Sequence, residues 1–266
     1  MAIDPTAQVH ASAVIEEGAV IGAGCRIGPF CLIGAEVVLA EDVILHSHVV
    51  VTGATQIGTG TEVFPFASLG QIPQDLKFKG EKTRLVIGAR NRIREYVTMN
   101  TGTEGGGGLT QIGDDGLFMS SCHVGHDCKI GDRVILVNSV AVAGHCHLAD
   151  DVIVGGLSGV HQWVRIGRGA MIGALSMVTA DVLPHGLVAG PRAQLEGMNL
   201  VGLRRRGTER AQVSELKALY ATLSSGNFRQ TAREKSDLGV EGALSREVLD
   251  FILGPSDRSF LTPHGK

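Results

Sequence analysis

An apolar residue recurs at every sixth position through most of this chain, and this period restricts the fold more than any other feature. The repeat runs from Ile3 to Leu69, resumes from Ile87 to Met99, and resumes again from Ile112 to Val178. Neither the 3.6-residue period of an α-helix nor the two-residue alternation of a β-strand produces this pattern. A solenoid does, because each short strand ends at a corner and the next strand presents the same face to the interior.

The pattern resembles the hexapeptide-repeat family, whose members form left-handed parallel β-helices with three hexapeptides in each triangular coil. The resemblance alone implies the handedness, because general chain chirality favours the opposite crossover. Runs of twelve, three and twelve repeats would give 27 repeats in nine coils. Residues 18 apart in the sequence would then be vertical neighbours, with coils about 4.8 Å apart. We therefore expect an all-β solenoid, a left-handed parallel β-helix of hexapeptide repeats.

The two interruptions of the period predict loops that leave the solenoid, at about 71–84 and 101–111. Long loops on a rigid scaffold often carry functional residues. The glycine run Gly105–Gly108 lies in the second loop, but neither Gly-Lys-Ser/Thr nor a helix follows it. We interpret the run as a flexible loop and not as a phosphate cradle.

The period stops after Pro184, and two later segments have the spacing of amphipathic helices. One begins near Thr208 and should end at Gly226, and the other covers about 241–254 and should end at Gly254. The predicted domains are a β-helix over 1–190 and a small α-helical domain over 191–266.

Composition excludes several classes of function. The formal net charge of −3 gives no reason to expect nucleic acid as a partner. No apolar run is long enough, at about 18 residues, for a membrane span. The N-terminal segment lacks the basic and apolar regions of a secretory signal. Five cysteines without a disulfide-framework spacing fit the reduced thiols of a cytoplasmic protein.

The stretch SSCHVGHDCKIG, residues 120–131, combines two histidines, two cysteines and an aspartate. Its cysteines fall at the fifth position of their repeats, which other repeats fill with alanine or valine and which the family directs inward. We interpret all five cysteines of the chain as small core residues and not as nucleophiles; they are Cys25, Cys31, Cys122, Cys128 and Cys146.

The histidines occupy outward positions of their repeats. Adding 18 to His126 gives Gly144, with His145 beside it, so these residues should cluster on one edge of the solenoid. Three interpretations remain open: a zinc site, which needs three or four converging ligands, solvated surface histidines, or an acid/base site. The last is favoured by Asp127 and by a nearby Gly144 N–H, and histidine, with a pKa of about 6.5, suits proton removal from a hydroxyl.

A closer resemblance rests on five segments, in chain order QIPQDLKFKGEKTRLVIGARNRIRE, SCHVGHDCKIG, VAGHCH, GVHQW and GMNLVGLRRRG. They resemble the acyl-carrier-protein:UDP-N-acetylglucosamine O-acyltransferase family, which begins lipid A synthesis, and the resemblance covers nearly the whole chain. It implies transfer of an (R)-3-hydroxyacyl group from acyl carrier protein to the 3-hydroxyl of UDP-N-acetylglucosamine. It also implies a homotrimer, direct attack on the thioester, and no metal or other cofactor.

The same resemblance implies a role for individual residues. His126 would be the general base, Asp127 would support it, and the Gly144 N–H would donate to the oxyanion. Ala174 would form the floor of the acyl groove, which implies a chain of intermediate length. The residues expected to form the substrate pocket are Asp75, Lys77, His123, His145, His161, Gln162, Ala174, Arg192, Asn199, Arg205 and Arg206.

Two positions depart from the family pattern, because many relatives have glutamate in place of Val201 and histidine in place of Arg192. Three alternatives accompany the main hypothesis. One is a related acyltransferase that uses a 3-amino sugar, and another is a metal-dependent protein similar to the γ-class carbonic anhydrases, although the histidine spacing here does not resemble theirs. The third is a non-catalytic scaffold, which would need neither a histidine cluster nor two shaped loops.

Overall fold

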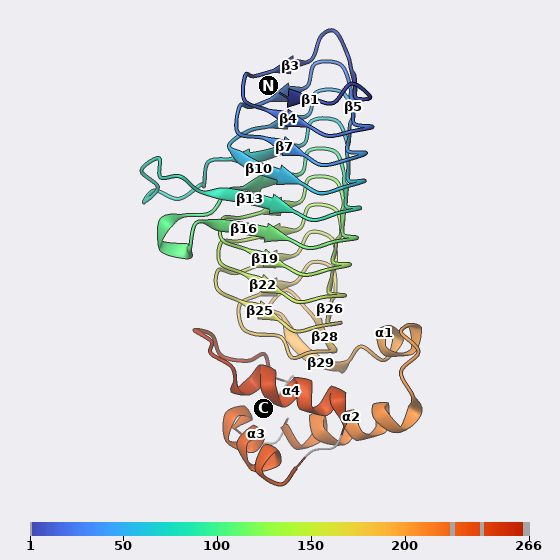
Figure 1. Cartoon of the computed structure of the whole chain (residues 1–266). Coiled ribbons are helices and arrows are strands. Elements are labelled where there is room, and N and C mark those ends of the chain that lie inside the picture. The colour runs from blue at the N-terminus through green and yellow to red at the C-terminus, as the bar shows by residue number, and fades with distance from the viewer. Residues whose placement is uncertain (1, 224–226, 240–241, 263–266) are drawn as a thin grey trace.

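The computed structural model describes residues 2–223, 227–239 and 242–262. The chain passes through three sheets in turn. The strands β1 (Ala2–Ile3), β2 (Gln8–Val9) and β3 (Val14–Ile15) lie in different sheets, and β4 (Val20–Ile21) pairs in parallel with β1. The 18-residue register predicted from the period is confirmed, since Ala2 is paired with Val20 and Ile3 with Ile21. Figure 1 shows the circuits stacked as a column, with the C-terminal helices at one end.

Most strands contain only two residues, because the chain turns a corner in every repeat. Sheet A contains β1 (Ala2–Ile3), β4 (Val20–Ile21), β7 (Val38–Leu39), β10 (Ala54–Ile57), β13 (Arg84–Ile87), β16 (Leu109–Ile112), β19 (Lys129–Ile130), β22 (His147–Leu148) and β25 (Arg165–Ile166). Sheet B contains β2 (Gln8–Val9), β5 (Arg26–Ile27), β8 (Ile44–Leu45), β11 (Glu62–Val63), β14 (Arg92–Ile93), β17 (Leu117–Phe118), β20 (Ile135–Leu136), β23 (Ile153–Val154), β26 (Met171–Ile172), β28 (Gly186–Ala189) and β29 (Gln194–Met198). Sheet C contains β3 (Val14–Ile15), β6 (Leu32–Ile33), β9 (Val50–Val51), β12 (Ser68–Gln71), β15 (Thr98–Asn100), β18 (His123–Val124), β21 (Ala141–Val142), β24 (Gly159–Val160) and β27 (Met177–Val178).

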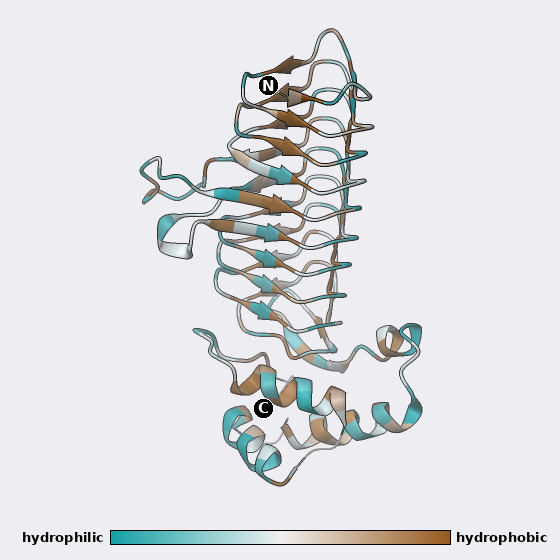
Figure 2. Ribbon diagram, viewed as in Figure 1, coloured by the Kyte–Doolittle hydropathy of each residue, from teal (hydrophilic) through white to brown (hydrophobic). Residues whose placement is uncertain are grey.

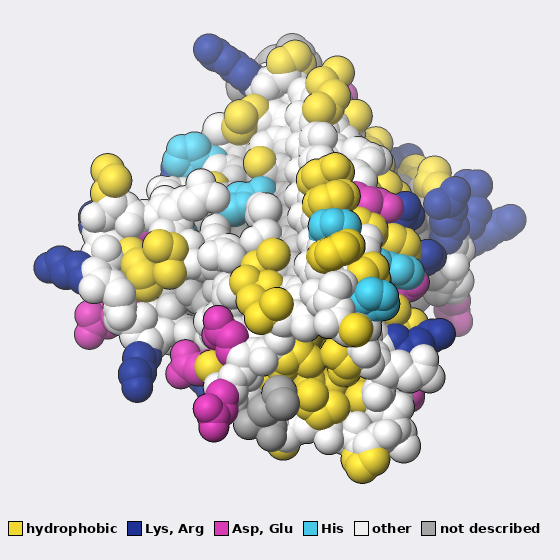
Figure 3. Space-filling model, turned by 90° about the horizontal axis from the view of Figure 1, so that it is seen from above, with side chains coloured by type: hydrophobic (Ala, Val, Ile, Leu, Met, Phe, Trp, Pro, Cys, Tyr) yellow, Lys and Arg dark blue, Asp and Glu magenta, His cyan; other side chains and the backbone are white. Residues whose placement is uncertain are grey.

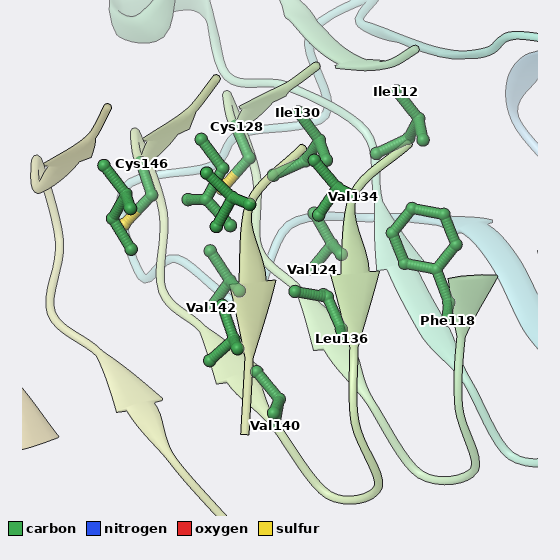
Figure 4. Packing of buried hydrophobic residues seen from close by; sticks show 14 of the residues in the cluster. Ile112, Phe118, Val124, Cys128, Ile130, Val134, Leu136, Val140, Val142 and Cys146 are labelled. Atoms are coloured by element: carbon green, nitrogen blue, oxygen red, sulfur yellow. The ribbon is translucent and has the colours of Figure 1, made fainter. Parts of the chain in front are cut away.

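The core of the column consists of aliphatic side chains and cysteines. All five cysteines are buried, which confirms their interpretation as core residues. Figure 4 shows Cys128 and Cys146 among valines of the neighbouring coils. Burial raises the pKa of the Cys122 thiol to about 11, so a reactive thiolate is disfavoured. In Figure 2 the strands of the first coils are hydrophobic, as a column with an aliphatic interior requires.

Both predicted loops leave the column, and their bounds are slightly narrower than the period suggests. The first covers 72–83, because β12 and β13 extend to the loop, and the second covers 101–108, because β16 begins at Leu109. The second loop contains a short 3₁₀-helix, Glu104–Gly106, whose N-cap is Thr103. The glycine run is therefore partly helical.

Four helices follow the sheets. The helix expected to end at Gly226 reaches Leu223, and Gly226 lies outside the described residues. The helix expected to end at Gly254 does so. The period gave no sign of the other two helices or of the β28–β29 hairpin, which continues sheet B past residue 190. No described helix is long and apolar enough to cross a membrane. The helices are α1 (Leu200–Arg205), α2 (Arg210–Leu223), α3 (Phe228–Asp237) and α4 (Ala243–Leu253).

Candidate active site

The predicted histidine cluster lies on the edge between sheets C and A. We call His126, Asp127, Gly144, His145 and Trp163 the histidine corner. Successive coils stack in register here, because the His145 N–H donates to the His126 carbonyl at 2.9 Å and the Trp163 N–H to the Gly144 carbonyl at 3.3 Å. The prediction from the 18-residue step, that Gly144 and His145 lie next to His126, is therefore confirmed.

His126 and Asp127 form a buried pair. The Nδ1 atom of His126 lies 2.8 Å from Oδ2 of Asp127, and the two residues are only 7% and 6% exposed. The Thr103 N–H and hydroxyl donate to the Asp127 carboxylate at 2.8 and 2.6 Å, and the Asp127 N–H donates to the Thr110 hydroxyl at 2.8 Å. The carboxylate therefore has a fixed orientation. Because it binds Nδ1 of the imidazole, Nε2 points away from Asp127.

Thr103 and Thr110 were not predicted as site residues. Both belong to the second loop or its return strand, and the period of six gives no information on either. The loop approaches the carboxylate closely: a Cβ atom at Gly106 would lie 2.0 Å from Cγ of Asp127. A glycine is therefore required where this loop covers the corner.

Gly144 combines a close approach with an unpaired backbone donor. A Cβ atom at this position would lie 2.6 Å from both Cε1 and Nε2 of His126, so only glycine lets the imidazole lie against the backbone. Among the described residues, none accepts a hydrogen bond from the Gly144 N–H. An unpaired donor beside a ring nitrogen is the arrangement that an oxyanion site needs.

The His145 ring lies between the rings of His126 and Trp163. The His145 ring meets the His126 ring edge-on, with 4.8 Å between centroids, and it stacks on Trp163 at 3.8 Å. His123 is hydrogen-bonded through Nδ1 to the Thr98 hydroxyl at 2.8 Å. Burial lowers the pKa of both His123 and His145, which favours neutral imidazoles on either side of His126.

The first loop brings the predicted residues Asp75 and Lys77 to the histidine corner. They line a cavity of about 760 Å³ together with His145, Trp163 and Glu104 of the second loop. The Asp75 carboxylate accepts the Lys77 N–H at 2.9 Å, which shapes the loop. Charged side chains of both loops therefore line the same cavity as His145 and Trp163.

His161 and Gln162 lie directly before Trp163, in the coil that follows His145, and are exposed. Arg258, which follows α4, contacts both: one terminal nitrogen lies 2.6 Å from Nδ1 of His161, and Nε donates to the Gln162 carbonyl at 3.0 Å. Arg258 was not predicted, because it lies far from His161 and Gln162 in the sequence and outside the repeats.

Five predicted residues do not reach this corner in a single chain. Asn199, Arg205 and Arg206 line a separate cavity of about 680 Å³ on the outer face of sheet B, which also contains Val201. Ala174 is exposed on the edge between sheets B and C, and Arg192 is exposed in the β28–β29 turn.

His126, Asp127 and His145 could also hold a metal ion, since one ligand atom of each lies within 4.8 Å of the others. A metal would have to compete for Asp127 oxygens that already accept hydrogen bonds from Thr103 and contact Nδ1 of His126. The arrangement fits proton transfer better than metal binding, because every polar atom of the Asp127 carboxylate has a protein partner.

Comparison with known proteins adds independent information. The family model described as bacterial transferase hexapeptide (six repeats) matches residues 18–53, and the model described as Udp N-acetylglucosamine O-acyltransferase, domain 2, matches residues 181–261. The chain is 68% identical over 202 residues to an acyl-[acyl-carrier-protein]–UDP-N-acetylglucosamine O-acyltransferase of Paracoccus denitrificans, covering 76% of this chain and 77% of the relative. An Agrobacterium fabrum protein of the same name is 43% identical over 266 residues, covering 98% of each chain. A crystal structure of a UDP-N-acetylglucosamine acyltransferase superposes with a TM-score of 0.94 at 41% identity, covering 97% of this chain and all of that one.

Proposed function

This chain belongs to the acyl-carrier-protein-dependent UDP-N-acetylglucosamine O-acyltransferases, and we propose that it uses His126 as the general base of their reaction. The enzyme transfers an acyl group from acyl carrier protein to UDP-N-acetylglucosamine, the first step of lipid A synthesis. We also infer that the three-sheet column is a left-handed β-helix, as in this family, and that 1–190 and 191–266 are its two domains.

In the proposed mechanism, Nε2 of His126 removes the proton from the sugar 3-hydroxyl as the oxygen attacks the thioester carbonyl of an (R)-3-hydroxyacyl group. A carbon–oxygen bond forms, and the carbonyl oxygen becomes an oxyanion that accepts the Gly144 N–H. The carbon–sulfur bond then breaks, and the imidazolium returns its proton to the departing thiolate. Asp127 stabilises the imidazolium through Nδ1.

The observation that supports this mechanism best is the chain of hydrogen bonds from Thr103 through Asp127 to His126, which ends beside the unpaired Gly144 N–H. Turnover of an acyl-carrier-protein thioester tests it. His126→Ala should reduce kcat by about 10²–10⁴-fold, whereas His10→Ala, at an exposed histidine of the first coils, should not. Equal activity of both variants would assign the base to another residue, and loss of wild-type activity with a chelator would favour the metal alternative.

We further propose a homotrimer whose sites are completed by a second copy. His126 lies on the edge between sheets C and A, whereas Asn199 and Arg206 face outward from sheet B, so one chain cannot present both to one UDP-sugar. Contact between sheet C of one copy and sheet B of the next would join them.

The edge between sheets B and C supports this arrangement. It carries an exposed aromatic column, Phe30, His48, Phe66 and Tyr96, with successive ring centroids 5.0, 5.0 and 5.2 Å apart. In a view down the molecule, hydrophobic and histidine side chains are grouped together while Lys and Arg lie at the periphery (Figure 3). A three-fold axis along this edge would remove the rings from water.

Co-expression of two impaired chains tests the shared site. Mixed trimers of His126→Ala and Arg206→Ala chains should regain activity, because some sites then combine an intact His126 with an intact Arg206. Light scattering should give the mass of three chains. A monomer, or mixtures no more active than the separate variants, would contradict the proposal.

A further inference from the structure

His185 is a buried histidine outside the histidine corner, and the proposed mechanism gives it no part. It is 0% exposed and lies at φ 62° in the turn between Pro184 and β28. Its N–H donates to the Arg168 carbonyl and its carbonyl accepts the Asn199 N–H, both at 2.7 Å. The turn therefore connects the last coil to the residue that caps α1.

The imidazole of His185 links a carboxylate on α4 to an arginine at the end of α1. Its Nδ1 atom lies 3.2 Å from a terminal nitrogen of Arg206, and its Nε2 atom lies 3.3 Å from Oε2 of Glu247. A guanidinium only donates hydrogen bonds, so Nδ1 must accept, and Nε2 must carry the N–H that donates to Glu247. Only the neutral imidazole can make both bonds.

Glu247 is a fixed anion at the other end of this chain of contacts. Arg168 donates to both of its carboxylate oxygens, at 2.8 and 2.7 Å. Burial acts to raise the pKa of Glu247, but the hydrogen bonds from Arg168 and His185 lower it to about 2. The Tyr220 hydroxyl of α2 donates to the carbonyl of Pro184, the residue before His185. The charged or titratable side chains described around His185 are therefore Glu247, Arg168, Arg206 and Tyr220.

Arg206 lies at the border of the 680 Å³ cavity that also contains Arg205 and Asn199. Its contact with His185 requires a glycine beside it: a Cβ atom at Gly169 would lie 2.5 Å from the Arg206 guanidinium and 2.8 Å from Nδ1 of His185. Glycine at this position of the last coil therefore leaves room for the contact between His185 and Arg206.

We propose that His185 is a positioning residue, whose neutral imidazole, anchored by Glu247, orients Arg206 toward the diphosphate of the acceptor nucleotide. This inference rests on the proposed function, which places UDP-N-acetylglucosamine in the cavity with Arg206. Without an acceptor atom opposite the guanidinium, Arg206 would be released, and binding of the acceptor nucleotide should weaken.

Steady-state kinetics test this role. His185→Ala should raise the KM for UDP-N-acetylglucosamine by about tenfold at pH 8, because a hydrogen bond to a charged group is lost. The kcat and the KM for the acyl-carrier-protein thioester should change by less than about twofold. His185→Asn keeps an oxygen that can accept from Arg206 and tolerates positive φ. Its KM for the acceptor should stay low.

A double-mutant cycle separates positioning from a merely structural role. Arg206→Ala alone should raise the KM for the acceptor, and adding His185→Ala should raise it by less than about twofold more. Additive effects, or a His185→Asn enzyme whose KM for the acceptor rises as much as that of His185→Ala, would overturn the positioning role. If Arg206→Ala leaves this KM unchanged, the acceptor binds elsewhere, and both the cavity assignment and the role of His185 are wrong.

Discussion

Gly106→Ala should impair catalysis, although it adds only one methyl group to a loop outside the histidine corner. The new Cβ atom would lie 2.0 Å from Cγ of Asp127 and 2.3 Å from each carboxylate oxygen. Non-bonded carbon atoms are most stable at about 3.5–4.0 Å, so the loop and the carboxylate must separate by about 1 Å or more. The same loop supplies both Thr103 hydrogen bonds to Asp127, and its displacement would disturb them as well.

The expected loss follows from that displacement. A misplacement of about 1 Å in a catalytic arrangement can cost about 10²-fold in rate. We therefore expect kcat to fall by about 10- to 100-fold, which corresponds to about 1.4–2.8 kcal/mol of activation free energy. The KM for UDP-N-acetylglucosamine should change little, because Asp127 contacts His126 and not the substrate in the proposed mechanism. Initial rates with an acyl-carrier-protein thioester measure both constants.

Gly105→Ala is the matched control, because it makes the same chemical change one residue away. A Cβ atom at Gly105 meets no heavy atom within 4 Å, so this variant should retain wild-type kcat. Thermal unfolding of both variants verifies that each chain is folded. If Gly106→Ala and Gly105→Ala have the same kcat, the loop does not control the position of Asp127 and the reasoning is refuted.

Three further predictions concern other parts of the molecule. Thr103→Val, which removes the hydroxyl that donates to Asp127 at 2.6 Å, should lower kcat by about tenfold while Thr103→Ser remains near wild type; equal losses in both would contradict this. Because burial lowers the pKa of His123, its contribution to stability is present above the unfolded pKa of about 6.5 and lost as the pH falls through the folded value. The melting temperature should therefore fall between about pH 7 and pH 5, and less steeply in His123→Gln; parallel curves would refute the assignment. Ala174→Gly should shift the preference among carrier-protein thioesters toward longer acyl chains and Ala174→Met toward shorter ones, by about fourfold per methylene; unchanged preferences would make Arg192 the next residue to test.

The parts of the fold that the sequence predicts are those that obey the period of six. Counting in steps of 18 placed Gly144 and His145 next to His126, and the backbone hydrogen bond between His145 and His126 confirms it. The same counting assigned the cysteines to the interior, because a side chain's position in the repeat determines whether it points inward. Register in a stacked solenoid is local, so no long-range information was needed.

The parts that could not be predicted depend on contacts without a period. Thr103 reaches Asp127 only because the second loop folds back over the corner, and Glu247 reaches His185 only because α4 packs against the last coil. Loop closure and helix docking bring together residues far apart in sequence, and a single sequence contains no regular signal for either. The sequence also did not indicate that Arg206 lies apart from His126 in one chain, since a family pattern names pocket residues without assigning each to one copy or another.

The left-handed backbone of the histidine corner is not strain stored for catalysis, because the same conformation occurs elsewhere in the column. Asp127 and His145 have φ of 59° and 62°, and Ser139 and Leu157, on a different edge, have 61° and 59°. A conformation that costs about 1–2 kcal/mol per residue thus recurs at corners along the whole column, and it is offset by the hydrogen bonds between coils. The site differs from other corners in its side chains and in the loop that covers them. The second loop, and not the repeat, fixes the orientation of the Asp127 carboxylate. A substitution at Gly106 therefore tests the proposed mechanism more directly than a substitution at a corner residue.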